Sequence, residues 1–359
     1  MILSQTGSVS RDSVSRVHGG PDASGPVRYD FSSNANSVGA NPVVVDLIRQ
    51  ADLIHYPDPA YQALRDGLAR WHGVSPSRIL MAGSASEFIF RMTSFIARQY
   101  GAEDSRLTTG QGCLNQTASV WLPEHAYGDY EAAARAWSVP RVESYEESSL
   151  LWFCDPSSPL GQPVKDLSKI VNGLIAGQIA VLDCAYEPLR LEGSLNLSAD
   201  QLDRLWQMWT PNKALGMTGV RGAYVIAPLG GEHIVEILTA IAPSWLIGAD
   251  GVAMLNAWMR DDVQTWLKDC LITLRQWKFQ QLELCQQLGW QSIESTANFF
   301  CASSPLFKPA QYLPVLREFD IKLRDAASFG LSNHVRIAVM PPDAQQKLRE
   351  AWAYFERGI

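Results

Sequence analysis

The sequence has 359 residues, of which 47% are hydrophobic and 19% are charged, and its formal net charge is −7. This composition is typical of a globular protein with a large core, and the length favours two domains. The negative charge argues against a nucleic-acid partner, and no apolar run is long enough for a membrane span or a signal peptide.

Short apolar segments alternate with helical segments along most of the chain. Because such alternation is typical of α/β folds, we predict a mostly parallel sheet with helices on both faces. The predicted strands lie at 79–81, 119–121, 151–154, 179–182, 205–209 and 223–227, and the predicted helices at 85–100, 128–136 and 230–242.

A long amphipathic segment, rich in Trp and Leu, runs from about 250 to 288 and is expected to be one linking helix. The expected organisation is an N-terminal arm at 1–40, a large domain at 41–249, a linking helix at 250–289 and a small α+β domain at 290–359. The arm is expected to join the small domain.

One strand is predicted to end at an acid. Ile179 to Leu182 is an apolar run followed by Asp183, and Tyr186 comes shortly after it. Ligands of open α/β sheets bind at such strand ends, and a buried carboxylate there needs a cationic partner. A protonated pyridine nitrogen is one such partner, and helix capping by Asp183 is the alternative.

The next motif surrounds a lysine. Thr210, Asn212 and Lys213 precede a glycine-rich turn that carries Arg221. The lysine amine can form a Schiff base with an aldehyde cofactor, while Thr210 and Arg221 can bind a phosphate. The alternative is an ordinary lysine in a polar loop, but the ordered occurrence of both motifs favours a cofactor site.

The cysteines show no metal-binding spacing, so no metal site is predicted. Cys154 and Cys184 lie in apolar strands and are expected to be buried free thiols. Such thiols fit a reducing compartment, and a cytoplasmic location is expected.

These motifs, in this order, resemble the class I and II aminotransferases of pyridoxal-phosphate fold type I, and in particular the branch of histidinol-phosphate aminotransferase and L-threonine-O-3-phosphate decarboxylase. The resemblance runs from about His18 to the C-terminus. It implies pyridoxal 5'-phosphate as the cofactor, with Lys213 as the Schiff-base lysine, Asp183 as the partner of the ring nitrogen and Tyr186 as a donor to the ring oxygen.

The resemblance also implies further cofactor contacts. Ser84, Ala85 and Ser86 match the turn that holds the phosphate, and Tyr127 matches the aromatic residue stacked on the ring. Ser158 stands where the family usually has an asparagine bonded to the ring oxygen, and its side chain is shorter. Asn212 replaces the usual serine beside the lysine.

A homodimer with shared active sites follows from the resemblance as well. Tyr61 ends a segment, Tyr56 to Tyr61, that is similar to the family's YPDP-x-Y segment, and it is expected to reach the phosphate of the neighbouring subunit. The substrate, a small amino acid or phosphorylated amine, is expected to contact five further residues: His18, Asn34, Asn298, Arg324 and Arg336.

Three functions remain open. The N-terminal motif around His18 and Asn34 favours a threonine-phosphate decarboxylase, whereas an aminotransferase for histidinol phosphate or an aromatic amino acid is the alternative. A cofactor-binding regulatory module is disfavoured, because the resemblance leaves no room for a DNA-binding domain. A dinucleotide dehydrogenase is disfavoured, since no G-x-G-x-x-G motif follows a predicted strand.

Overall fold

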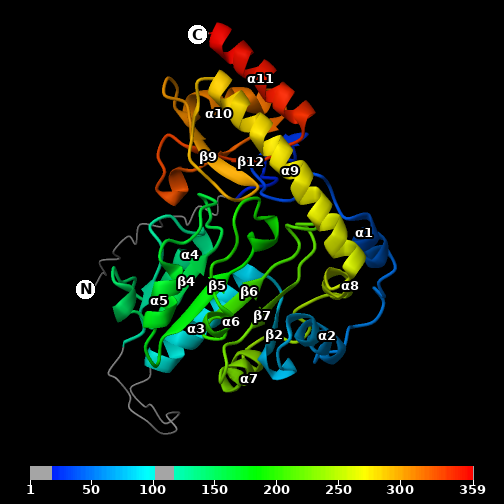
Figure 1. The fold of residues 1–359 in the computed structure, drawn as a ribbon, viewed down its shortest axis with the longest axis vertical. Coiled ribbons are helices and arrows are strands. Elements are labelled where there is room, and N and C mark those ends of the chain that lie inside the picture. The colour runs from blue at the N-terminus through cyan, green and yellow to red at the C-terminus, as the bar shows by residue number, and fades with distance from the viewer. Residues whose placement is uncertain (1–17, 102–116, 359) are drawn as a thin grey trace, which may run out of the picture.

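The computed structural model describes residues 18–101 and 117–358. Its larger sheet has six strands in the order β2-β7-β6-β5-β4-β3 (Figure 1). All strands run parallel except β7, so the predicted α/β fold with a mostly parallel sheet is confirmed. The strands are β2 (Ile79–Ala82), β3 (Val120–Trp121), β4 (Leu150–Cys154), β5 (Ile179–Asp183), β6 (Trp206–Trp209) and β7 (Ala223–Ile226).

Helices cover both faces of this sheet because successive strand residues point to opposite sides. In β4, Trp152 belongs to the core beneath α3 (Ala85–Gly101), α4 (Gly128–Ala136) and α7 (Glu232–Ala240). Its neighbours Leu151 and Phe153 belong to the core beneath α5 (Leu167–Gly173) on the other face. On this other face, β2 and β7 pack against α2 (Gln62–His72) and α8 (Ala249–Trp258).

A second sheet of four strands has the order β11-β12-β9-β8. Its core includes Phe31, which lies directly after β1, and β1 pairs in parallel with β10. The N-terminal segment thus packs with the C-terminal part of the chain (Figure 1). The elements are β1 (Tyr29–Asp30), β8 (Gln291–Ser292), β9 (Phe299–Ser303), β10 (Ile321–Lys322), β11 (Arg324–Asp325), β12 (Val335–Ala338), α10 (Pro309–Glu318) and α11 (Pro342–Arg357).

The expected single linking helix is wrong in one respect, since it is interrupted. Helix α8 ends at Trp258, and α9 begins at Asp261 and continues to Gln287. Arg260 between them has an extended backbone, with φ −81° and ψ 140°. Its side chain pairs with Asp262, which lies in the first turn of α9 and whose Oδ1 also accepts from the N–H of Val263. Acids at a helix start favour such a second beginning.

The remaining short elements connect these layers. They are α1 (Pro42–Arg49), α6 (Ala199–Leu202), η1 (Pro76–Arg78), η2 (Tyr145–Glu147), η3 (Glu187–Leu189) and η4 (Ala327–Phe329). Cys154 and Cys184 are buried free thiols, as expected, while Cys113 lies outside the described residues. Within residues 18–101 and 117–358, no helix is long and apolar enough to cross a membrane.

Candidate active site

The topology of the larger sheet brings the sequence motifs to one edge. Strands β2, β6, β5, β4 and β3 all point their carboxyl ends in the same direction, and antiparallel β7 begins at that edge. Ser84 therefore follows β2 there, Asp183 ends β5, and Thr210 follows β6. Arg221 precedes β7 and joins them. This is the edge at which open α/β sheets bind ligands.

Lys213 lies in the turn between β6 and β7. Its Nζ atom is 5.4 Å from the centroid of the Tyr186 ring. Its backbone carbonyl accepts from the N–H of Asn36 at 2.8 Å, so the N-terminal loop packs directly on the lysine turn. Gly216 in this turn has φ +68°, and a Cβ there would collide with the backbone of Gly39. The turn therefore needs glycine at position 216 for two reasons.

Asp183 is 4% exposed and both of its carboxylate oxygens accept hydrogen bonds. The Tyr130 hydroxyl donates to Oδ2 at 2.7 Å, and the N–H of Ala185 donates to Oδ1 at 2.9 Å. Burial raises the pKa of Asp183, while the Tyr130 hydroxyl, the Lys213 charge and the Ala185 N–H oppose this rise. Such a carboxylate suits a cationic ligand group, because an ion pair would offset the free-energy cost of burying its charge.

Tyr127 precedes α4 beside the start of α3. Its hydroxyl donates to Asp129 at 2.8 Å and lies 3.2 Å from the hydroxyl of Ser86. Burial raises the pKa of Tyr127, and the charge of Asp129 adds to this effect. The His18 ring is exposed, and its centroid is 6.1 Å from that of Tyr127. The structure thus brings three predicted site residues, Ser86, Tyr127 and His18, into one group.

The start of α3 provides the predicted anion site. The hydroxyl of Ser84 accepts from the N–H of Glu87 at 3.1 Å and so caps this 17-residue helix. Ala85 is the first residue of the helix. Helix N-termini of this kind attract phosphate. Thr210 and Asn212 are buried, and their Oγ1 and Oδ1 atoms have no partner among the described residues. Arg221 is exposed, so its guanidinium is accessible from solvent.

Two arginines face each other in the smaller sheet. Arg324 in β11 pairs in register with Arg336 in β12, and both are buried. Burial and the charge of Arg336 lower the pKa of Arg324 to about 10. Arg336 donates to the hydroxyl of Ser158 at 3.2 Å and to the carbonyl of Ser32 at 3.1 Å. It makes no ion pair within the part of the chain that the structure describes.

The predicted substrate residues Asn34 and Asn298 lie next to each other and are buried. Asn34 donates to the hydroxyl of Tyr186 at 3.4 Å. Asn298 donates to the carbonyls of Asn34 and Ala35, at 3.3 and 3.1 Å. Each has a side-chain oxygen with no hydrogen-bond partner among the described residues. Asn298 therefore holds the N-terminal loop, while Asn34 contacts Tyr186.

Tyr61, which is expected to reach the neighbouring subunit's cofactor, is hydrogen-bonded within its own chain. The residue is 6% exposed, and its hydroxyl donates to the carbonyl of Ile247 at 3.0 Å and accepts from the N–H of Ile247 at 2.9 Å. The hydroxyl thus both donates and accepts a hydrogen bond inside its own chain, and its contact with the neighbouring subunit's cofactor remains a prediction. Tyr56 in the same segment is 77% exposed and stacks on Trp245.

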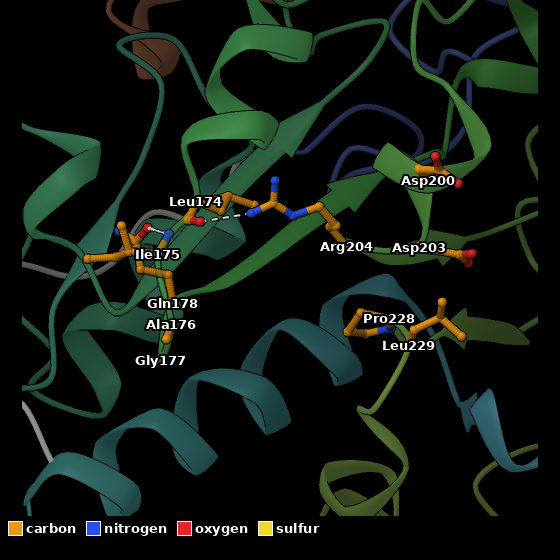
Figure 2. A pocket seen from close by; sticks show the side chains of 10 residues that line it. All are labelled: Leu174, Ile175, Ala176, Gly177, Gln178, Asp200, Asp203, Arg204, Pro228 and Leu229. Carbon is orange, nitrogen blue, oxygen red and sulfur yellow. Dashed lines mark hydrogen bonds between the residues drawn. The ribbon is translucent and has the colours of Figure 1, made fainter. Parts of the chain in front are cut away.

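A cavity of about 540 Å³ lies away from these residues (Figure 2). It is lined by residues that precede β5 and β6 and follow β7, so it is at the opposite edge of the larger sheet. The guanidinium of Arg204 in this cavity already donates to the carbonyls of Asn172 and Leu174. The cavity therefore contributes nothing to the candidate site.

The residues at the active edge, which is the edge of the larger sheet where β2, β3, β4, β5 and β6 end, fit pyridoxal phosphate. Lys213 offers an amine, Asp183 a buried carboxylate, and the start of α3 an anion site, while the unpartnered oxygens of Thr210 and Asn212 leave hydrogen bonds to be made. This fold and this set of groups define an enzyme of pyridoxal-phosphate fold type I.

The chain belongs to the family of class I and II aminotransferases, whose profile matches residues 29–352. The cofactor is accordingly pyridoxal 5'-phosphate. The histidinol-phosphate aminotransferase of Rhodospirillum rubrum is 28% identical over 91% of this chain and 90% of its own length. The enzyme of the same name from Ruegeria pomeroyi is 25% identical over 86% of each chain.

Solved structures agree on the fold. Histidinol-phosphate aminotransferase from Sinorhizobium meliloti in complex with pyridoxal-5'-phosphate has a TM-score of 0.75 and 19% identity, covering 99% of this chain and 100% of that one. L-threonine-O-3-phosphate decarboxylase from Porphyromonas gingivalis has a TM-score of 0.74 and 18% identity, covering 91% of this chain and 99% of that one. At these identities, both likenesses show the fold alone.

Sequence reasoning missed Tyr130. It lies three residues after Tyr127, so both face the same side of α4, and this spacing was the available signal. What the sequence does not carry is the contact between Tyr130 and Asp183, which are 53 residues apart.

Proposed function

We propose that this protein is an aminotransferase that acts on a phosphorylated amine, with histidinol phosphate as the first candidate and 2-oxoglutarate as the amino acceptor. The observation that carries the proposal is the buried pair of Arg324 and Arg336, which face each other in register. Two guanidinium groups side by side repel each other and favour a ligand with at least two negative charges.

This pair suits both substrates of such a reaction. A phosphate monoester carries up to two negative charges, and glutamate and 2-oxoglutarate each carry two carboxylates. Arginine binds both groups through parallel hydrogen bonds. An enzyme that alternates between an amine phosphate and a dicarboxylate can thus use one arginine pair for both.

Transamination is preferred here over the decarboxylation that the N-terminal motif had favoured. The curated relatives that span most of this chain, such as those from R. rubrum and R. pomeroyi, are named histidinol-phosphate aminotransferases. The similarity to the decarboxylase rests on the fold, as its 18% identity indicates. The position of His18 near Tyr127 is compatible with either reaction.

The proposed tasks of the site residues follow from their positions. Pyridoxal phosphate supplies an aldehyde and a ring that withdraws electrons from the substrate. Lys213 would hold the cofactor and then carry a proton to and from the substrate carbon. Asp183 would bind the ring nitrogen, Tyr186 and Ser158 would face the ring oxygen, and Tyr127 would cover the ring face. The phosphate would bind Ser84, Ala85, Ser86, Thr210 and Arg221, with Asn212 alongside Lys213.

We also propose a homodimer, formed through an exposed apolar surface beside the active edge. Leu53 and Ile54 are 75% and 89% exposed, and Tyr56 and Trp245 stack with their ring centroids 4.4 Å apart. Large apolar side chains gathered in this way are typical of a protein interface. Tyr56, rather than Tyr61, is then the tyrosine of its segment that is available to the partner subunit. The buried free thiols fit a location in the reducing cytoplasm.

The deciding assay compares two reactions of the same holoenzyme. Histidinol phosphate with 2-oxoglutarate should yield glutamate, whereas L-threonine-O-3-phosphate alone should release no CO2. Release of CO2 from the second substrate without glutamate from the first would overturn the proposal and favour a lyase. An Arg336→Gln variant serves as the control: whichever activity is found should fall in this variant if it depends on the proposed anion site.

A further inference from the structure

Tyr130 lies behind the candidate active site and has no part in the function proposed above. It projects from α4 and is 1% exposed. Its hydroxyl donates to Oδ2 of Asp183 at 2.7 Å, which is the shorter of the two hydrogen bonds that this carboxylate accepts among the described residues. Among the described residues, no other side chain donates a hydrogen bond to Asp183.

The ring of Tyr130 is fixed by its neighbours. It stacks on the ring of Trp152, with centroids 4.8 Å apart and an interplanar angle of 12°. It meets the ring of Tyr127 edge-on, at 5.7 Å and 87°. Trp152 is itself 0% exposed in β4, so the stack has no room to rotate. One side chain therefore contacts both the carboxylate and the aromatic ring that are expected to hold the cofactor.

The electrostatic surroundings make this hydroxyl important for Asp183. The titratable groups that interact with the carboxylate are Tyr130 from α4, Lys213 from the turn after β6, and the thiols of Cys154 from β4 and of Cys184. Burial raises the pKa of Asp183, and Tyr130 is foremost among the groups that lower it. Burial and the charge of Asp183 also raise the pKa of Tyr130, so its hydroxyl keeps its proton and remains a donor.

We propose that Tyr130 is a positioning residue that keeps Asp183 ionised and directed at the ring nitrogen of the cofactor. This inference rests on the proposed role of Asp183. Without the hydroxyl, the pKa of Asp183 would rise, because one of the groups that lower it is gone. Asp183 would then compete more strongly for the proton of a bound ring nitrogen, and the ring would withdraw electrons less strongly.

The test measures how strongly the protein prefers a ring nitrogen. The cofactor is removed, and affinity is measured for pyridoxal phosphate and for its analogue with CH in place of the ring nitrogen. Tyr130→Phe keeps the stack on Trp152 and removes only the hydroxyl. Its preference for the ring nitrogen should fall about tenfold, the scale of one hydrogen bond to a charged group. Asp183→Asn should lose at least as much.

Tyr312→Phe is the matched control. Tyr312 is also 0% exposed, but it lies in α10, and its hydroxyl has no hydrogen-bond partner among the described residues. This variant should keep the wild-type preference. A second reading uses the visible absorbance of the holoenzyme, whose pH midpoint should move to higher pH in Tyr130→Phe and stay unchanged in Tyr312→Phe.

The outcomes separate the two claims. If Asp183→Asn keeps the preference, the proposed role of Asp183 fails. If Asp183→Asn loses the preference but Tyr130→Phe keeps it, the role of Asp183 stands and the inference about Tyr130 is overturned. Equal weakening of both affinities in Tyr130→Phe, with an unchanged absorbance midpoint, would assign Tyr130 a purely structural role and would also overturn it.

Discussion

At the scale of single residues, the environment of Asp183 is suited to pairing its carboxylate with the protonated ring nitrogen of the cofactor. The residue is buried, which alone would favour its neutral form, and it is supported by Tyr130 and the N–H of Ala185. Its charge therefore depends on a few specific contacts.

Replacing this charge should affect turnover much more than folding. In Asp183→Asn, we expect kcat to fall by orders of magnitude because the ring nitrogen loses its anionic partner. The melting temperature should change little, since the asparagine can keep the contacts with Tyr130 and Ala185. Steady-state kinetics and thermal unfolding of this variant check the expectation, with exposed Asp200→Asn as the control. Near-normal turnover would show that Asp183 does not bind the ring nitrogen.

The anion site gives a second prediction at this scale. Arg336→Gln should weaken binding of the phosphorylated substrate by roughly 2–5 kcal/mol, as expected when one partner of a buried charge pair is truncated. The measurement is kcat/KM with histidinol phosphate, and Arg135→Gln on the exposed side of α4 is the control. Equal effects of the two variants would remove Arg336 from the substrate site.

The positions of site residues were predictable where a short motif contains them. Lys213, Asp183 and Tyr186 come from such motifs, and the structure brings them to one edge. Tyr130 and Tyr61 were not predictable in this way. The contact of Tyr130 with Asp183 and that of Tyr61 with Ile247 join residues far apart in the sequence. Motif spacing gives no information about such long-range hydrogen bonds.

At the scale of elements, strand positions followed from apolar runs because a sheet covered on both faces is continuously apolar. All four residues of β2 and all five of β4 and β5 are buried. The break between α8 and α9 was not predicted, because the apolar pattern continues through it while the extended backbone of Arg260 interrupts the helix.

The end of α2 provides a test of element stability. His72 is largely buried, lies 2.8 Å from the hydroxyl of Tyr224, and burial lowers its pKa from 6.5 to about 4. Between these two values the unfolded chain binds more protons than the folded one, so stability falls as the pH falls. The loss between about pH 7.5 and about pH 5 should be roughly 2 kcal/mol from this residue.

Urea unfolding at both pH values checks this prediction. His72→Gln removes the titrating group, so its stability should depend less on pH than that of the wild type over the same window. Identical losses in the two proteins would mean that His72 does not stay neutral in the folded state.

At the scale of the whole molecule, the N-terminal segment packs with the C-terminal sheet, as Phe31 and the pairing of β1 with β10 show. The domain boundaries near residues 41, 250 and 290 remain a prediction. So does the dimer, which the exposed surface around Tyr56 and Trp245 supports.

The shared active site can be tested by mixing inactive subunits. Lys213→Ala and Tyr56→Ala should each be inactive or strongly impaired, and hybrid dimers should regain part of the activity, because one of their two sites has both residues intact. The same mixing experiment with Lys213→Ala and Tyr61→Phe serves as the comparison. No recovery after verified subunit exchange would indicate that Tyr56 acts within its own chain or has no role.

The most direct test of the central claim is to locate the covalent bond between cofactor and protein. The holoenzyme is reduced with borohydride, digested and analysed by mass spectrometry. We expect the reduced pyridoxyl group on Lys213, and Lys213→Ala should carry none. A pyridoxyl group on a different lysine, or one trapped in Lys213→Ala to the same extent, would contradict the account.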